Sequence, residues 1–220
     1  FHFSLYRKEI ALGIPTALEF FCWNASNLVL IRFLNGISIE ATAIYTLTFG
    51  VETIVFAIFS GNSRATMTII GQKIGSKELK SANSFFNTGL AINSGILIWF
   101  IAIFSIFPKQ ILSIFTRESS IVDLSAPFLV MTALIMIPKS INVITGNTIR
   151  AYGNTRWMLF SQIIGSILVV SCSFVLIRLF HVGVAAIYIT LFTDETVRAI
   201  INYIYYVRKY RSTKEVLNLT

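Results

Sequence analysis

The stretch LSAPFLVMTALIMIPKSINVITGNTI, residues 124–149, is a long apolar run that carries one charged residue, Lys139. A helix needs roughly 20 mostly apolar residues to cross the hydrocarbon core of a bilayer, and this run exceeds that length. Five similar runs occur elsewhere, at residues 10–34, 41–70, 82–107, 157–177 and 182–207. The sequence therefore predicts an all-α polytopic membrane protein, in which residues 1–220 form a single bundle of six transmembrane helices.

The overall composition agrees with this prediction. Of the 220 residues, 55% are hydrophobic and 13% are charged, whereas soluble domains carry about 25% charged residues. The net charge of +8 would by itself also suit a nucleic-acid-binding protein, so its distribution along the chain decides what it means.

The basic residues are divided unequally between the two ends of the predicted helices. Twelve lie on one side of the membrane: Arg7, Lys8, Arg64, Lys73, Lys77, Lys80, Arg150, Arg156, Arg208, Lys209, Arg211 and Lys214. Four lie on the other side: Arg32, Lys109, Arg117 and Arg178. Cytoplasmic loops carry the excess of Lys and Arg in multi-pass membrane proteins. We therefore expect a plasma-membrane protein with both termini of this segment cytoplasmic, and no nucleic-acid partner.

The start of the chain and its cysteines add smaller expectations. The first apolar run is too long for a signal peptide and lacks a small-residue cleavage site, so no cleavable signal peptide is expected. The chain begins at Phe1 rather than at a methionine. We therefore expect a segment of a longer protein. Cys22 and Cys172 lie in apolar runs, where they behave as small hydrophobic side chains, and no disulfide is expected.

Charged residues inside the runs are expected at one depth. Glu19, Glu52 and Asp194, counted from the start of their runs, and Lys139, counted back from the end of its run, lie roughly 14 to 18 Å deep at about 1.5 Å per residue. This depth is near the middle of a core about 30 Å thick. Each such charge costs at least ~2.5 kcal/mol at a helix centre. Several charges in one layer therefore predict ion pairs or a water-filled cavity.

The last run carries a pair of its own. Asp194 and Arg198 are spaced i, i+4, so they are predicted to form an ion pair on one helix face. This pair has either a structural or a direct functional role. Glu195 points elsewhere and lines either the same cavity or a helix contact.

Two polar stripes at helical spacing are expected to face a shared interior. The first consists of Glu19, Trp23 and Asn27 with Asn24 beside them, and the second of Lys139, Asn142 and Gly146. One interpretation is a salt bridge between Glu19 and Lys139 that only fixes helix register. The other is a site whose carboxylate gains and loses a cation or proton, with Lys139 as countercharge or competitor. Pro15 and Pro138 predict helix bends beside these charges.

Motifs for catalysis are not found in the sequence. The histidines are His2 and His181, both outside the expected membrane core. The sequence has no metal-ligand cluster, no glycine-flanked nucleophilic serine and no phosphate-binding loop. We therefore expect neither an enzyme nor a bound metal.

Five short segments carry a family pattern. Two of them are loops, TIIGQKIGSKELKSA at 68–82 and GNTIRAYGNTRW at 146–157. The other three are LGIPTALEF at 12–20, IFTRESSIVDLSAPFL at 114–129 and FTDETVRAI at 192–200. In the order in which they follow one another along the chain, the five segments resemble the multidrug and toxic compound extrusion (MATE) family of transporters over nearly the whole chain.

The resemblance implies that the chain is one six-helix lobe of a twelve-helix transporter built from two such lobes. The last helix resembles the end of MATE chains, and the aspartate typical of the first helix of the N-terminal lobe is absent, so we expect the C-terminal lobe. The family implies export of cationic amphipathic drugs in antiport with H⁺ or Na⁺, with no cofactor besides the coupling ion. Its partners would be those drugs, membrane lipids and the N-terminal lobe.

One residue departs from the family pattern. Sodium-coupled relatives carry a carboxylate in the fourth helix where this sequence has Lys139, so we expect proton coupling or a cation site in the N-terminal lobe. Glu19 lies in the expected helix, but Trp23 occupies the neighbouring position that some branches give to an acid.

Two alternative functions remain open at this stage. A lipid-linked sugar flippase of the same superfamily would need a more cationic cavity for its anionic substrate. A non-transporting membrane scaffold would have little reason to bury charges at one depth. The interior acids outnumber the interior bases, which favours cationic cargo: Glu19, Glu52, Asp194 and Glu195 against Lys139 and Arg198.

Overall fold

The computed structural model describes residues 3–211, and this part of the chain is helical with no strand. The elements are α1 (Phe3–Asn35), α2 (Ile39–Gly75), α3 (Leu79–Ile106), α4 (Pro108–Ser113), α5 (Ser119–Ala151), α6 (Thr155–Arg178), α7 (Ala185–Tyr206) and a π-helical turn, η1 (Val207–Arg211). Six of these are long helices that match the six apolar runs to within a few residues, except at helix ends that extend beyond a run, and the predicted all-α fold is confirmed. The short helix α4 was not expected; it begins at Pro108, a residue suited to a first helical turn.

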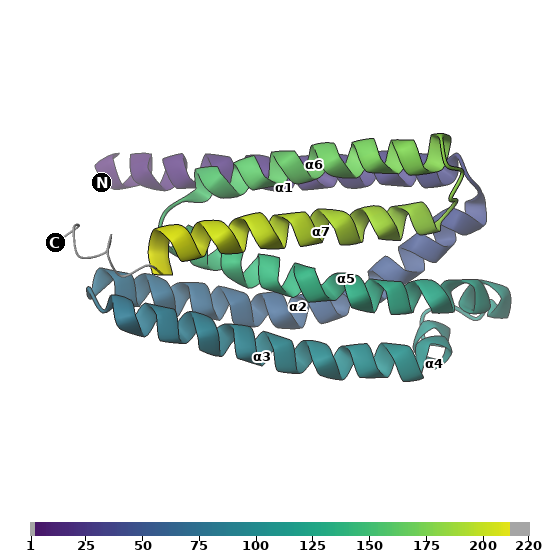
Figure 1. The fold of residues 1–220 in the computed structure, drawn as a ribbon, viewed down its shortest axis with the longest axis horizontal. Coiled ribbons are helices and arrows are strands. Elements are labelled where there is room, and N and C mark those ends of the chain that lie inside the picture. Colours follow the sequence, from purple (N-terminus) through teal and green to yellow (C-terminus); the bar gives the residue numbers. More distant parts are fainter. Residues whose placement is uncertain (1–2, 212–220) are drawn as a thin grey trace.

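The long helices run roughly side by side along one axis, and the start of α1 and the end of η1 lie at the same end of the bundle (Figure 1). α1 packs mainly on α6, while α5 packs on α2, α3 and α7. α2 connects the two groups because its first part crosses the bundle obliquely and its second part lies alongside α3 (Figure 1).

Five of the long helices, α1, α2, α3, α5 and α6, are long and apolar enough to cross a membrane. α7 differs because Asp194, Glu195 and Arg198 lie in its centre, although all three side chains are buried. The protein is therefore a multi-pass membrane protein, and the sixth crossing stays a prediction. The outer surfaces of the helices are strongly apolar; Phe20, Leu28 and Trp99, for example, are all exposed.

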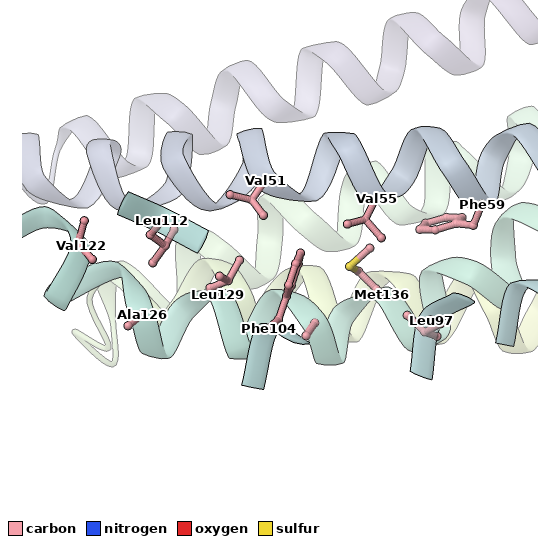
Figure 2. Close-up of a cluster of buried hydrophobic side chains, with 11 residues drawn as sticks. Val51, Val55, Phe59, Leu97, Phe104, Leu112, Val122, Ala126, Leu129 and Met136 are labelled. Carbon is pink, nitrogen blue, oxygen red and sulfur yellow. The ribbon is translucent and has the colours of Figure 1, made fainter. Parts of the chain in front are cut away.

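The largest hydrophobic core lies between α2, α3 and α5. Figure 2 shows three α2 side chains, Val51, Val55 and Phe59, above Leu129 and Met136 of α5. Because lipid tails are as apolar as these side chains, close packing rather than release from water holds membrane helices together. The core therefore fixes how α2 and α5 meet, and so the facing positions of Glu52 and Lys139 on these two helices.

Polar contacts also join α2 to α3. The side-chain amide of Asn62 donates to the side-chain oxygen of Asn93 at 2.7 Å, and Asn93 in turn donates to Ser63 Oγ at 3.0 Å. Asn93 and Ser63 are fully buried. Such hydrogen bonds between helices stabilise membrane bundles by about 0.6 kcal/mol on average.

Candidate functional site

A partly open cavity lies between α1, α2, α5, α6 and α7. Five charged residues line it: Glu52 from α2, Lys139 from α5, and Asp194, Glu195 and Arg198 from α7. It offers about 40 Å³ to the centres of water molecules, which is room for a few waters because one water needs roughly 10–15 Å³ on this measure. Three residues of the predicted layer of interior charges, Glu52, Lys139 and Asp194, therefore line one small cavity, and Glu19 is not among its lining residues.

Arg198 is the most heavily bonded cation of the cavity. Its Nε and Nη2 donate to the two carboxylate oxygens of Asp194 at 2.9 and 2.8 Å, which confirms the predicted i, i+4 pair. Nη2 also lies 3.0 Å from Oε1 of Glu195, and Nη1 donates to Oε1 of Gln162 on α6 at 2.9 Å. Arg198 thus ties α7 to α6 and compensates two carboxylates at once.

The close approach of α6 to α7 depends on a glycine. A Cβ atom at Gly165 would lie less than 3.0 Å from an Asp194 carboxylate oxygen and from the Arg198 side chain. No larger residue therefore fits on α6 at this point without moving the ion pair.

Lys139 pairs with a different helix. Its ammonium lies 2.6 Å from Oε1 of Glu52 on α2 and 3.9 Å from Oε1 of Glu195 on α7. The ring centre of Phe56 lies 5.3 Å from the ammonium, which adds a cation–π contact. The Lys139 and Glu52 side chains are only 14% and 8% exposed, so water does little to screen this pair.

The cavity carries an unequal number of charges. Three carboxylates, on Glu52, Asp194 and Glu195, face two cations, on Lys139 and Arg198. With all five groups ionised the formal charge is −1. Glu195 is the acid shared between the two cations, because Oε1 lies within 4 Å of both.

The predicted pairing of Glu19 with Lys139 is wrong. Glu19 pairs instead with Arg150, whose Nη2 lies 2.5 Å from Oε1 of Glu19. Arg150 lies at the end of α5 and reaches back along the bundle with its long side chain. Position along a run gives the depth of a residue and does not give the direction of its side chain. Glu19 is not among the described residues that line the cavity, and its Oε2 is buried without a hydrogen-bond partner.

The other residues of the predicted site divide into two groups. Trp23 and Asn27 line the cavity, and the hydroxyl of Tyr45 donates to Oδ1 of Asn27 at 2.8 Å. Asn142 reaches the cavity through its hydrogen bond to Glu195. Asn24 does not line the cavity; its amide donates to the backbone oxygen of Phe20 on its own helix.

Two further predictions concern the proline residues near the site and the binding of a metal ion. α1 and α5 continue as helices through Pro15 and Pro138, and the bends expected there stay predictions. Within residues 3–211, no group of three or more His, Cys, Asp or Glu side chains is arranged to hold a metal ion.

Sequence reasoning missed the central position of Glu195 and the contributions of Gln162 and Arg150. The spacing of Glu195 and Arg198, i to i+3, is a signal that was available, because such residues are neighbours on a helix surface. Gln162 and Arg150 gave no such signal, since their partners lie far away in the chain.

The family model described as MatE matches residues 15–175, which is most of the chain. The chain belongs to the MatE family. The match includes four of the five lining helices, α2 and α5 over their whole lengths and α1 and α6 over most of theirs, and it ends before α7. The MATE resemblance seen in the sequence is thereby confirmed.

Proteins of similar sequence agree with membership in the MatE family. The uncharacterized transporter YisQ of Bacillus subtilis (strain 168) is 26% identical over 96% of this chain and 46% of its own length. The probable multidrug resistance protein NorM of Pasteurella multocida (strain Pm70) is 21% identical over 72% of this chain and 34% of its own length. The chain thus spans less than half the length of these relatives.

Solved structures show the same fold. A crystal structure of MATE in the bent conformation superposes with a TM-score of 0.87, at 15% identity over 94% of this chain and 46% of that chain. A MOP superfamily transporter from Pyrococcus furiosus, described as having a binding pocket of reverse polarity, gives a TM-score of 0.84 at 16% identity, over 93% of this chain and 45% of that chain. The MatE chain therefore has the fold of about half of a MATE transporter.

Proposed function

We propose that this chain is the C-terminal lobe of a secondary transporter that exports cationic amphipathic compounds across the cell membrane in exchange for protons. The observation that carries the proposal is the cavity with three carboxylates and two cations. The protein would act without catalysis and without a cofactor, as transporters of this family do.

The excess carboxylate favours the binding of one additional cation or proton at the cavity. An uncompensated charge is costly in a poorly solvated site, so a proton that neutralises it is favoured there. A cationic substrate bound beside the cavity would compete with that proton through its charge, because either one offsets the excess negative charge. Release of one on binding of the other is the coupling that an antiporter requires.

The size of the cavity separates the place of the proton from the place of the substrate. Pockets for drug-sized ligands measure about 300–1,000 Å³, whereas this cavity has room for a few waters. The substrate is therefore proposed to bind between this lobe and the N-terminal lobe, where the two halves of such transporters move against each other. The names of the relatives, probable multidrug resistance proteins, support a drug as the substrate class.

Protons are favoured over Na⁺ as the coupling ion because Lys139 lies among the acids and repels a second cation. The alternative of a lipid-linked sugar flippase is disfavoured by the same charge count, since an anionic substrate would meet a net negative cavity. Counting the Glu19–Arg150 pair as well, the interior still has four acids against three bases.

The test uses the full-length protein in proteoliposomes and a fluorescent substituted-ammonium dye. An imposed proton gradient should drive dye movement, and a sodium gradient alone should not. Glu52→Gln and Glu195→Gln should each reduce the rate and change its pH dependence. Asp123→Asn is the matched control, because Asp123 forms an exposed ion pair with Lys109 far from the cavity. If both cavity variants transport at the original rate and with the original pH profile, the cavity does not couple transport to protons.

A further inference from the structure

A chain of hydrogen bonds connects the cavity to the end of the bundle where α1 begins and η1 ends. The indole Nε1 of Trp157 donates to Oδ1 of Asn202 at 2.9 Å. Nδ2 of Asn202 donates to Oδ1 of Asn142 at 2.8 Å, and Nδ2 of Asn142 donates to Oε2 of Glu195 at 2.9 Å. We call Asn202 and Asn142 the amide relay. It crosses from α6 to α7, then to α5, and back to α7.

The direction of the amide relay follows from its outer end. An asparagine side chain can turn over, exchanging its donor and acceptor, so two asparagines alone could run in either direction. An indole N–H is a donor only. Trp157 therefore requires the oxygen of Asn202 to face it, which turns the Asn202 amide nitrogen toward Asn142 and the Asn142 nitrogen toward Glu195.

Trp157 is itself held firmly. It is the third residue of α6, and its ring stacks on Tyr205 with 3.9 Å between ring centres and 8° between ring planes. Tyr205 in turn accepts a hydrogen bond from Asn154 and another, at 2.9 Å, from Lys209. The relay amides are buried, with Asn202 fully inaccessible and Asn142 6% exposed, so water is a poor substitute for either partner.

Both oxygens of Glu195 consequently face donors. Oε1 faces Arg198 at 3.0 Å and Lys139 at 3.9 Å, while Oε2 accepts from Asn142. A proton on Oε2 would point at the N–H of Asn142. The other charged groups around Glu195 are Asp194 on its own helix and Glu52 on α2, each bonded to one of the same cations, and α6 contributes the neutral Gln162.

We propose that Trp157 is a positioning residue that fixes the direction of the amide relay and thereby holds Glu195 in its ionised form. The proposal deepens the proposed function, because it makes the proton occupancy of the cavity depend on a contact at the end of the bundle. If that contact opens, Asn202 and Asn142 can turn over together, and Asn142 then presents its oxygen to a protonated Glu195. A movement of α6 relative to α7 would in this way change the proton affinity of the cavity.

The experiment measures protonation directly and does not depend on transport. Infrared difference spectra of the purified full-length protein across a pH series report the carboxylic C=O band of Glu195, which is assigned by its loss in Glu195→Gln. Trp157→Phe keeps the stacked ring and removes the N–H donor. It should shift the midpoint of that band to higher pH, with a rise in proton affinity of about ten-fold or more, because a hydrogen bond to the ionised form of Glu195 is weakened. Trp99→Phe, at an exposed tryptophan of α3, should leave the midpoint unchanged.

A second variant tests the same idea from the middle of the relay. Asn202→Leu removes the connection, so it should shift the midpoint in the same direction, and adding Trp157→Phe should cause no further shift. An unchanged midpoint in Trp157→Phe, or shifts that add in the double variant, would overturn the role of Trp157. If Trp157→Phe and Asn202→Leu shift the midpoint as expected but the full-length protein fails to exchange dye for protons, the proposed function is refuted and the role of the amide relay stands.

Discussion

The ammonium of Lys139 lies 2.6 Å from Oε1 of Glu52, so an ion pair joins α5 to α2 across the cavity. The same ammonium lies 3.9 Å from Glu195 on α7. Lys139 is therefore surrounded by acids from two helices. Its charge compensates theirs, which explains how a lysine is tolerated in the middle of an apolar helix.

Loss of the Lys139 charge should destabilise the protein. In Lys139→Met the Glu52 carboxylate loses its partner, and breaking one side of a buried pair costs about 3–5 kcal/mol. The loss should be larger at alkaline than at mildly acidic pH, because a proton can neutralise the stranded acid. Thermal unfolding of the full-length protein in detergent measures it. Lys109→Met is the control, since its pair with Asp123 is 62% exposed on both sides and such pairs contribute about 0–1 kcal/mol.

Gly165 should tolerate no side chain. Gly165→Ala places a methyl group against the Asp194–Arg198 pair, and overpacking of this kind costs about 1–3 kcal/mol. Gly95→Ala on α3 meets nothing within 4 Å and should leave stability unchanged or slightly raised, because alanine favours helix. Comparing the two unfolding temperatures checks this prediction. Equal behaviour of the two variants would show that α6 and α7 are not closely packed at the ion pair.

The orientation in the membrane can be tested by labelling. We expect single cysteines at Asn35 and His181 to react with an impermeant thiol reagent added outside the cell, and a cysteine at Lys77 to be protected. The expectation follows from the excess of basic residues on the Lys77 side. The background variant lacks Cys22 and Cys172, which are both partly accessible free thiols. Labelling of the Lys77 position from outside would reverse the proposed topology.

The loop between α2 and α3 should loosen in acid. A hydrogen bond from Lys73, helped by one from Ser76, holds the pKa of Glu78 below its usual value. Because the folded pKa is the lower one, the stabilisation by this carboxylate is present above the unfolded pKa and disappears as the pH falls through the folded pKa. The protection of the amides of residues 76–79, measured as their hydrogen-exchange rates relative to the rates of an unstructured peptide at the same pH, should decrease over that range. In Glu78→Gln this protection should be low throughout and should not change with pH in this range.

Sequence reasoning succeeded where the signal was local. Run length predicted the long helices, and i, i+4 spacing predicted the Asp194–Arg198 pair, because both depend only on the geometry of one helix. Contacts between helices were not predictable in this way. Glu52 and Lys139 are 87 residues apart in the chain, and their meeting depends on the oblique course of α2 and on core packing that no single stretch encodes.

The error over Glu19 has the same physical cause. Glu19 and Lys139 were assigned to one depth, which is a statement about distance along two helices. Whether two side chains meet also depends on rotation about each helix axis and on side-chain length. Arg150, counted as a basic residue near the membrane surface, is long enough to reach Glu19 from the end of α5, so the expected partner was replaced by a more distant one along the chain.

Two separate ion pairs predict two separate sets of mutational effects, and this is the sharpest test of the arrangement. Lys139 and Glu52 are in contact, so a double-mutant cycle of Lys139→Met and Glu52→Gln should give an interaction energy within the 0.5–3 kcal/mol that contacting residues show, about 2 kcal/mol or more for this buried pair. The double variant should be more stable than Lys139→Met alone, because the cavity then carries one excess negative charge instead of two.

The matched cycle pairs Lys139→Met with Glu19→Gln. Glu19 is bonded to Arg150 rather than to Lys139, so the two effects should add to within roughly 0.3–0.5 kcal/mol, as they do for residues without shared partners. In the same full-length variants, Glu19→Gln should still reduce dye export, because its buried and unpartnered Oε2 is a further place where a coupling proton could be held. A strong interaction between Glu19 and Lys139, with a weak one between Glu52 and Lys139, would mean that α1 and α5 face each other directly in the working protein.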